Sequence, residues 1–351
     1  MKRMIVLVLA GCFLIGTLSA QVLDKPAATV KLTKTESITV SQLQKAITAL
    51  EGQAKRTLTT DERKQVLDAL IANILILQAA VRDKVVISDA EMKTVVASFE
   101  QQLGNAYQLG RSMTDAELET YAKSGGLTLD ALQKQLRDQQ TMLAYVRQKR
   151  KDMFDAIKPA TDQDIQDYYD NNKTNYFMTD MITLKHIFID TRQLTSKDDR
   201  DKAAKHADDV LKELKAGAAF ADLVTKYSED TGSKYNGGVL GTWFRGSTQV
   251  RQTFGAAFFD AVFKLKKGEM SGVLQSNLGY HIVLVTERLD ARLLGLNDKI
   301  PPQNQMTVKD AITNTLMLQQ QNDVLKAAEA DLVAELRKQA EIKIFDDNIG
   351  W

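Results

Sequence analysis

One segment of this chain is apolar on nearly every face of a helix, and it narrows the possible folds more than any other feature. Residues 66–81 read VLDALIANILILQAAV. A helix that is hydrophobic all round has to be buried, so other helices must pack around this one. The sequence between residues 22 and 175 predicts such helices, because helix-start signals recur there, mostly a hydroxyl residue followed three positions later by an acid or amide. These signals begin at Ser41, Thr60, Ser88, Thr114 and Thr161.

The beginning of the chain has the pattern of a secretory signal peptide. Basic residues 2–3 precede an apolar run over residues 4–18, and Ser19-Ala20 offers a small-residue cleavage site. The run is shorter than the roughly 20 apolar residues that span a bilayer. A second interpretation is that LAGC, ending at Cys12, is a lipobox, so that the protein is a lipoprotein anchored to a membrane. We expect cleavage after Ala20 and export to the periplasm, and we leave residues 1–20 out of the fold.

The composition excludes some classes of protein and bounds the size of the fold. The chain has 351 residues, of which 44% are hydrophobic and 26% charged, and this length predicts two or three domains. Its formal net charge of +1 provides no electrostatic basis for binding nucleic acid. Because Cys12 is the only cysteine, the chain cannot form an intramolecular disulfide.

Residues 181–288 change to a mixed pattern. Residues 182–189 (ITLKHIFI) alternate as a strand does, and helices are expected over about 199–215 and in AFADLVTKYS and AFFDAVFKL. A glycine-rich stretch leads into a strand at VLGTW, and SGVLQ and YHIVLVTE flank the turn SNLG as a hairpin. The order β-α-α-β-α-β-β describes a small α+β domain.

The last part of the chain predicts a single long helix and a final strand. Residues 304–340 carry one apolar stripe, with Thr307 as the expected N-cap, and the helical domain is the expected host of that stripe. Residues 342–345 are an expected strand, with residues 28–32 as its partner. The two ends of the chain would then close one helical domain, built from residues 21–175 and 300–351, into which residues 181–288 are inserted.

Two of the three histidines lie in expected strands at opposite ends of this inserted domain. His186 and His281 each stand in an alternating apolar setting, and strands from the two ends of a compact α+β unit often pair in its middle. One interpretation is two satisfied core histidines. Another is a facing pair with Asp230 as the nearby acid, and a third is a metal site made by the same three residues.

The inserted segment resembles the parvulin family of peptidyl-prolyl isomerases. LKHIFI, FADLVTKYSEDTGSKYNGGVLGTWFRG and KLKKGEMSGVLQSNLGYHIVLV keep the order and spacing of that family over about 108 residues. The flanking TDAELETYAKSG and GLTLDALQKQLRDQQ are similar to the helical chaperone domain of exported foldases of the SurA and PrsA types. The resemblance therefore implies a parvulin-like domain inserted into a helical chaperone domain.

The resemblance also implies a set of site residues. The polar network would be His186, Asp230, His281 and Ser276. The substrate-binding residues would be Leu240 and Phe258, with Thr248 nearest to the family's pocket methionine, and to these we add Trp243 at the end of the glycine-rich stretch. Two departures stand out: Val239 replaces the usual acid, and GSTQVRQTFGAAFF is about six residues longer than the family's segment.

The expected function is that of an exported peptidyl-prolyl cis-trans isomerase and chaperone without cofactor or metal. Its partners would be unfolded or nascent exported polypeptides and their X–Pro segments, including secreted or outer-membrane proteins. The longer segment after residue 245 keeps an alternative open, a holdase chaperone whose parvulin domain is weak or inactive. A proline-isomerisation assay separates the two.

Overall fold

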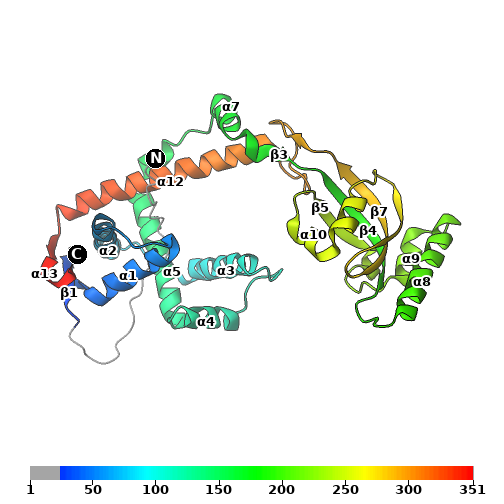
Figure 1. Cartoon of the computed structure of the whole chain (residues 1–351). Helices are drawn as coiled ribbons and strands as arrows, with labels where there is room; N and C mark the ends of the chain where they lie inside the picture. The colour runs from blue at the N-terminus through cyan, green and yellow to red at the C-terminus, as the bar shows by residue number, and fades with distance from the viewer. Residues whose placement is uncertain (1–23, 351) are drawn as a thin grey trace. The chain divides into compact units, whose positions relative to one another are not determined.

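The structure is a computed structural model that describes residues 24–350 and divides the chain into two compact units (Figure 1). Of the described residues, the first unit contains those up to Pro159 and from Leu318 onward, and the second unit is Ala160–Met317. The expected insertion of one domain into another is therefore present. Residues 160–175 and 300–317, which the sequence analysis assigned to the helical domain, belong to the second unit instead. The expected signal peptide and Cys12 lie outside the described residues.

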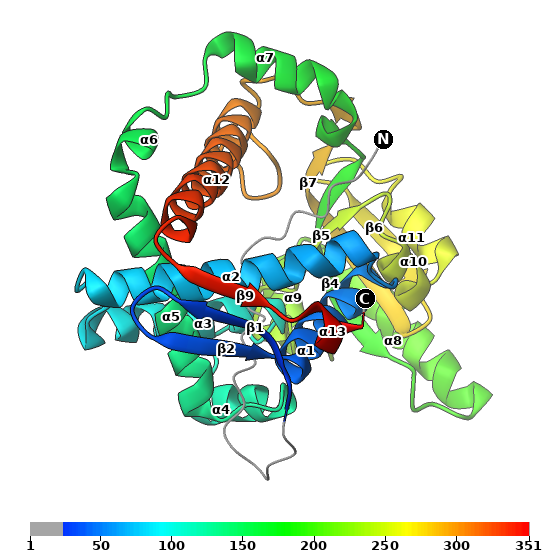
Figure 2. The ribbon, with the colours of Figure 1, turned by 90° about the vertical axis from the view of Figure 1, so that its left-hand side faces the viewer.

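A three-stranded antiparallel sheet brings the two ends of the described chain together in the first unit (Figure 2). Its order is β2-β1-β9, with β1 at Pro26–Lys31, β2 at Thr35–Thr39 and β9 at Glu341–Ile344. Ala28 pairs with Ile344 and Val30 with Ile342. The predicted pairing between the tail and residues 28–32 is confirmed.

Helices form the rest of the first unit. They are α1 (Val40–Ala54), α2 (Thr60–Arg82), α3 (Asp89–Ala106), α4 (Asp115–Ser124), α5 (Leu129–Lys149), α6 (Lys151–Asp155) and the short α13 (Asp346–Ile349). Among the described residues, α2 is the one helix long and apolar enough to cross a membrane, but 56% of its apolar window is buried inside the protein. It is the core helix that the sequence predicts.

The helix starts follow the predicted capping chemistry, with two corrections. Ser88, Thr114 and Thr161 each form the expected capping box. The first two helices instead use Thr39 with Gln42, and Thr59 with Glu62. The hydroxyl that caps is the last residue before the chain turns helical, and β2 ends at Thr39, two residues before the expected Ser41.

The long helix α12 (Val308–Arg337) begins in the second unit and ends in the first. Its N-cap is Thr307 as expected, since the Asp310 amide donates to Thr307 Oγ1 at 3.1 Å. The apolar stripe serves two cores, not one. Ala328, Leu332 and Leu336 are buried in the first unit. Val308 and Ile312 are buried in the second, against Ile165, Tyr169, Met178 and Leu294.

The second unit is built on a four-stranded antiparallel sheet of order β5-β4-β7-β6. Its strands are β4 (Met181–Asp190), β5 (Val239–Phe244), β6 (Met270–Gln275) and β7 (Gly279–Leu289). Its helices are α7 (Asp162–Asn171), α8 (Lys197–Lys215), α9 (Phe220–Tyr227), α10 (Thr248–Phe254) and α11 (Ala256–Val262), with 3-10 turns η1 (Lys173–Tyr176) and η2 (Lys234–Asn236). The strands β3 (Phe177–Met178) and β8 (Arg292–Leu293) form a separate pair. The order confirms the predicted α+β class, while α10 was not predicted.

The two faces of this sheet carry different helices. Ile187 and Ile282 face α8 and α9 and form one core with their apolar residues. Ile182, Leu184 and Val283 face the other way and pack with α11. Figure 1 shows α10 on the side of the sheet opposite to α8 and α9. Side chains at even positions of β4 and odd positions of β7 therefore point towards α10 and α11.

Candidate active site

His186 and His281 are brought together by the register of the two central strands. In β4 and β7, His186 pairs with Val283 and Phe188 pairs with His281. The two histidines are thus diagonal neighbours on the face that carries α10 and α11, a separation within reach of aromatic side chains. Both are almost fully buried, at 2% and 1% exposure. The predicted facing pair is confirmed.

Asp230 reaches His186 from the loop that follows α9. Hydrogen bonds tie this loop to β4: the Phe188 amide donates to Ser228 Oγ at 3.2 Å, and the Glu229 amide donates to the Phe188 carbonyl at 2.8 Å. The carboxylate of Asp230 then lies 3.0 Å from His186 Nε2. Its side chain is 31% exposed, so Asp230 meets solvent, whereas the imidazole that it contacts is buried.

Glycine lets the loop return to β5 beside His186. Gly238 has a φ of 75°, and its carbonyl accepts a hydrogen bond from the His186 amide at 2.8 Å. A Cβ atom at this position would lie 2.5 Å from the His186 carbonyl oxygen and 2.9 Å from Val224 Cγ2. Any side chain at 238 would therefore push the loop away from β4.

The four residues that the resemblance implies for the polar network form one chain of hydrogen bonds. His186 Nδ1 lies 3.1 Å from His281 Nδ1, and Ser276 Oγ lies 2.7 Å from His281 Nε2. Ser276 Oγ also accepts hydrogen bonds from the Leu278 and Gly279 amides at 3.0 and 3.3 Å. The chain thus runs from Asp230 through both imidazoles to a hydroxyl held in the β6–β7 turn.

Burial and the Asp230 charge set the protonation of this chain. Burial lowers the pKa of His186, and burial together with the neighbouring His186 lowers the pKa of His281 to about 3. Burial works against ionisation of Asp230, but the hydrogen bonds from Ser233 and His186 outweigh it and lower the pKa of Asp230. Near neutral pH both imidazoles are therefore neutral and Asp230 is charged.

The tautomers follow from these charges. A carboxylate only accepts hydrogen bonds, so His186 carries its proton on Nε2 and accepts at Nδ1. His281 then donates from Nδ1 and accepts at Nε2, where the Ser276 hydroxyl donates. Because the two imidazole nitrogens face each other across a shared proton, the three residues do not form the metal triad considered from the sequence. No group of three or more His, Cys, Asp or Glu side chains suited to a metal ion occurs among residues 24–350.

Aromatic rings enclose the histidine pair on the helical side. The Phe258 ring centroid lies 4.7 Å from that of His281, and Trp243 lies 6.2 Å from Phe258. Phe258 is only 2% exposed and Trp243 only 5%, so both belong to the wall of the site. Leu240 is partly exposed and packs against the same core. The structure brings these three predicted residues together.

Thr248 is not part of this arrangement. It is exposed at the start of α10, and the partly exposed Phe254, at the end of the same helix, packs against the site instead. The Phe254 centroid lies 4.8 Å from Trp243 and 5.9 Å from His281. The extra residues of this segment form α10 and leave an aromatic side chain at the site. The backbone amide of Asn277 donates a hydrogen bond to the Phe254 carbonyl at 3.0 Å, which ties α10 to the turn that carries Ser276.

Sequence reasoning also missed Ser233. This buried hydroxyl lies 3.2 Å from His186 Nε2 and donates to Asp230 Oδ2 in a very short contact. It holds the carboxylate against the imidazole. Serine is a common turn residue, so the sequence alone offered no reason to single it out.

The comparisons with known proteins agree with this geometry. Residues 169–289 match the PPIC-type PPIASE domain family (Rotamase_3). The foldase protein PrsA of Clostridium kluyveri is 26% identical over 373 residues, covering 99% of this chain and 98% of that protein. PrsA of Clostridium botulinum is 26% identical over 290 residues, covering 82% of this chain and 75% of that protein.

Solved structures give a weaker likeness. One is reported as "The virulence factor PEB4 and the periplasmic protein Cj1289 are two structurally-related SurA-like chaperones" of Campylobacter jejuni. Its sequence identity is 21%, the match covers 88% of this chain and 97% of that chain, and the TM-score is 0.34. PrsA from Bacillus subtilis has 24% identity, 90% and 95% coverage and a TM-score of 0.25. Residues 169–289 are thus matched by the PPIC-type PPIase domain family, and over nearly its whole length the chain is similar to PrsA foldases.

Proposed function

We propose that this protein is an exported foldase in which the second unit isomerises X–Pro bonds and the first unit holds the unfolded client. The observation that carries the proposal is the hydrogen-bonded chain from Asp230 to Ser276, which lies beside the partly exposed side chains of Leu240 and Phe254. The catalytic network is His186, Asp230, His281 and Ser276. Leu240 and Phe254 contact the proline ring, and Phe258 and Trp243 support them from within the core.

The chemical task of this site is to favour a twisted amide over a planar one. The barrier of roughly 18–20 kcal/mol comes from amide resonance, which places negative charge on the carbonyl oxygen. Apolar side chains around the proline exclude water that would otherwise solvate that charge. A carboxylate near the carbonyl oxygen disfavours the same charge-separated form. Both effects stabilise the twisted state relative to the planar one, and no covalent bond has to break.

The histidines act on the substrate through Asp230 in this proposal. Both imidazoles are buried and neutral, and their tautomers are ordered by one carboxylate. His186 and Ser233 hold that carboxylate in place, and His281 and Ser276 hold His186. A rigid chain of this kind keeps Asp230 aimed at the bound amide without reorganisation during the reaction.

The test measures cis-trans exchange of X–Pro peptides by the mature protein. We expect Asp230→Ala to lower the rate strongly, and Asp230→Asn to lower it as well, because asparagine keeps an acceptor but loses the charge. Asp209→Ala is the matched control, since Asp209 pairs with Lys212 on the surface of α8. A wild-type protein with no rate above background across several residues before proline would refute the enzyme and leave the holdase alternative.

The holding function is tested in the full chain with the isomerase site disabled. Suppression of aggregation of an unfolded outer-membrane-type client should persist in Asp230→Ala, because client binding is assigned to the first unit. It should also persist at high salt, since the net charge of +1 leaves little scope for capture by the overall charge. Loss of suppression in the folded variant would assign client binding to the second unit.

The site of action is a further part of the proposal. The signal-peptide pattern of the N-terminus and the resemblance to exported foldases support export, with cleavage after Ala20 and release into the periplasm, or lipidation at Cys12 as the alternative. Mass spectrometry of the mature N-terminus from cells decides between them: an unmodified residue 21 supports cleavage, and a diacylglyceryl cysteine supports anchoring.

A further inference from the structure

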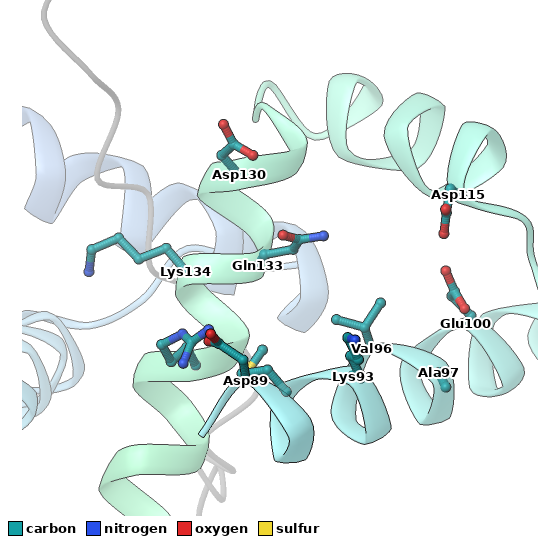
Figure 3. Close-up of a pocket in the computed structure, with 11 residues that line it drawn as sticks. Asp89, Lys93, Val96, Ala97, Glu100, Asp115, Asp130, Gln133 and Lys134 are labelled. Carbon is teal, nitrogen blue, oxygen red and sulfur yellow. The ribbon is translucent and has the colours of Figure 1, made fainter. Parts of the chain in front are cut away.

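The first unit contains a pocket that the isomerase chemistry does not use. It has a volume of about 600 Å³ and lies between α3, α4 and α5 (Figure 3). This volume is in the range of sites that take small ligands or a few side chains. Met92, Val96 and Ala97 of α3 form its apolar wall. We refer to it as the α3–α5 pocket.

Two of the three basic side chains that line the α3–α5 pocket already have acidic partners. Its Arg137 binds the Asp89 carboxylate at 2.8 Å and the Ile87 carbonyl at 2.6 Å, and its Lys134 pairs with Asp138. Lys93 is the remaining base.

Besides Asp89, three carboxyl groups line the same pocket, at Glu100, Asp115 and Asp130. Within residues 24–350 none of the three has a cationic partner in an ion pair or hydrogen bond. The pocket therefore has three carboxyl groups without a basic partner and one base, Lys93, outside the ion pairs described above.

Two of these acids face each other at one end of the pocket. Figure 3 shows the carboxyl groups of Glu100, on α3, and Asp115, in the first turn of α4, pointing towards one another. Glu100 Oε1 is buried and has no hydrogen-bond partner. Burial, together with the neighbouring Asp115, raises the pKa of Glu100. Two carboxyl groups so placed repel each other when both are charged, and a cation between them would relieve the repulsion and donate a hydrogen bond to Glu100 Oε1.

We propose that the α3–α5 pocket binds an extended segment of an unfolded polypeptide and takes one lysine or arginine side chain of that segment between Glu100 and Asp115. The proposal rests on client binding by the first unit and specifies which clients are preferred. Long basic side chains have an apolar stem and a charged head. The wall of Met92, Val96 and Ala97 matches the stem, and the carboxyl pair matches the head. The preferred segment is therefore apolar with a basic residue within it.

The test uses three short, proline-free, fluorescent peptides with the same apolar residues and a central Lys, Gln or Glu. Omitting proline keeps the isomerase site out of the measurement. We expect the full-length protein to bind the Lys peptide about tenfold more tightly than the Glu peptide in fluorescence anisotropy, because hydrogen bonds between charged groups are the strong ones. The Gln peptide should fall between them. Raising the salt concentration should shrink the difference.

The double variant Glu100→Gln/Asp115→Asn should bind all three peptides within about twofold of each other, since it removes both charges and keeps the shapes. Glu119→Gln/Asp155→Asn is the matched control: it removes two exposed carboxylates that pair with Lys123 and Lys151. It should keep the preference for Lys. The helical circular dichroism signal and its thermal unfolding transition establish that the first unit of each variant is folded.

The outcomes separate this inference from the function on which it rests. Equal binding of the three peptides by the wild type, or a Lys preference that survives in Glu100→Gln/Asp115→Asn, overturns the basic-residue site and leaves client binding in place. Absence of binding for every peptide overturns both. A Lys preference that is lost only in the pocket variant supports the site.

Discussion

Acidification should destabilise the isomerase unit through its buried histidines, and His281 allows the effect to be calculated. An unfolded histidine has a pKa of about 6.5, whereas burial and the neighbouring His186 lower the pKa of His281 to about 3. Between these two values the unfolded chain binds a proton that the folded chain does not. The free energy of unfolding therefore falls as the pH falls from about 6.5 towards 3, and it is fully retained above 6.5.

The size of the effect follows from the same two values. Going from pH 8 to pH 5, His281 alone should remove about 2 kcal/mol from the free energy of unfolding. The pKa of His186 is also lowered by burial, so its contribution has the same sign. Carboxylates with lowered pKa values lose their contributions only at more acidic pH, so the histidines dominate this interval in the second unit.

The assay follows the second unit through Trp243, which is buried beside the site. The chain has one other tryptophan, Trp351, and Trp351→Phe leaves Trp243 as the reporter. Urea unfolding of this protein at pH 8 and pH 5 gives the two free energies. In a His281→Gln background the difference between them should shrink by about 2 kcal/mol, even though the variant is less stable overall.

A control and a contrary result complete this experiment. Ile282→Val removes a methyl group from the buried core of β7 without touching a titratable group, and it should leave the difference between pH 8 and pH 5 as it is in the parent. If the parent and His281→Gln lose the same free energy on acidification, His281 is not a buried neutral base and the proposed tautomer chain is wrong.

Three further predictions concern the backbone, the long helix and the reaction. Gly238→Ala should destabilise the second unit by roughly 1–3 kcal/mol and lower isomerase activity, because φ is 75° and a Cβ atom would clash with the His186 carbonyl. An unchanged free energy of unfolding, followed by Trp243 fluorescence, would contradict the close approach of residue 238 to His186. Leu332→Ala should lower the free energy of unfolding of the first unit by about 2–5 kcal/mol, because the Leu332 side chain is buried in that core. Ile312→Ala should destabilise the second unit instead, because Ile312 is buried there. Helical circular dichroism follows the first unit and Trp243 fluorescence the second, and the reverse assignment would refute the division of α12 between the two cores. The X–Pro isomerisation rate should be flat from pH 8 to pH 7, because the lowered pKa values of both histidines and of Asp230 leave each group in one protonation state there; a steep change in that interval would show that one of them titrates during catalysis.

Local patterns in the sequence were sufficient for most of the secondary structure. Capping boxes, glycine breaks and alternation are properties of a few neighbouring residues, and they predicted the helices around α2 and the strands β4 and β7. The same patterns predicted that the tail pairs with residues 28–32, since a short alternating segment at each end of the chain needs a partner. They placed His186 and His281 in strands, with Asp230 as a nearby acid, and Trp243 at the end of the glycine-rich stretch. The family resemblance added Ser276, Leu240 and Phe258.

Tertiary structure alone decided how those residues work together. The register that sets His186 opposite Val283 is a contact between distant parts of the chain, and a one-residue slip would turn either imidazole to the other face. Ser233 and Phe254 join the site because a loop and an extra helix fold back onto the sheet, which no local pattern encodes. Likewise, an apolar stripe shows that α12 must be covered, but only the packing divides it between two cores. The direction of each hydrogen bond in the site follows from the charge of Asp230 and from burial, which keeps both imidazoles neutral. Burial is a property of the folded chain and cannot be read from a local pattern.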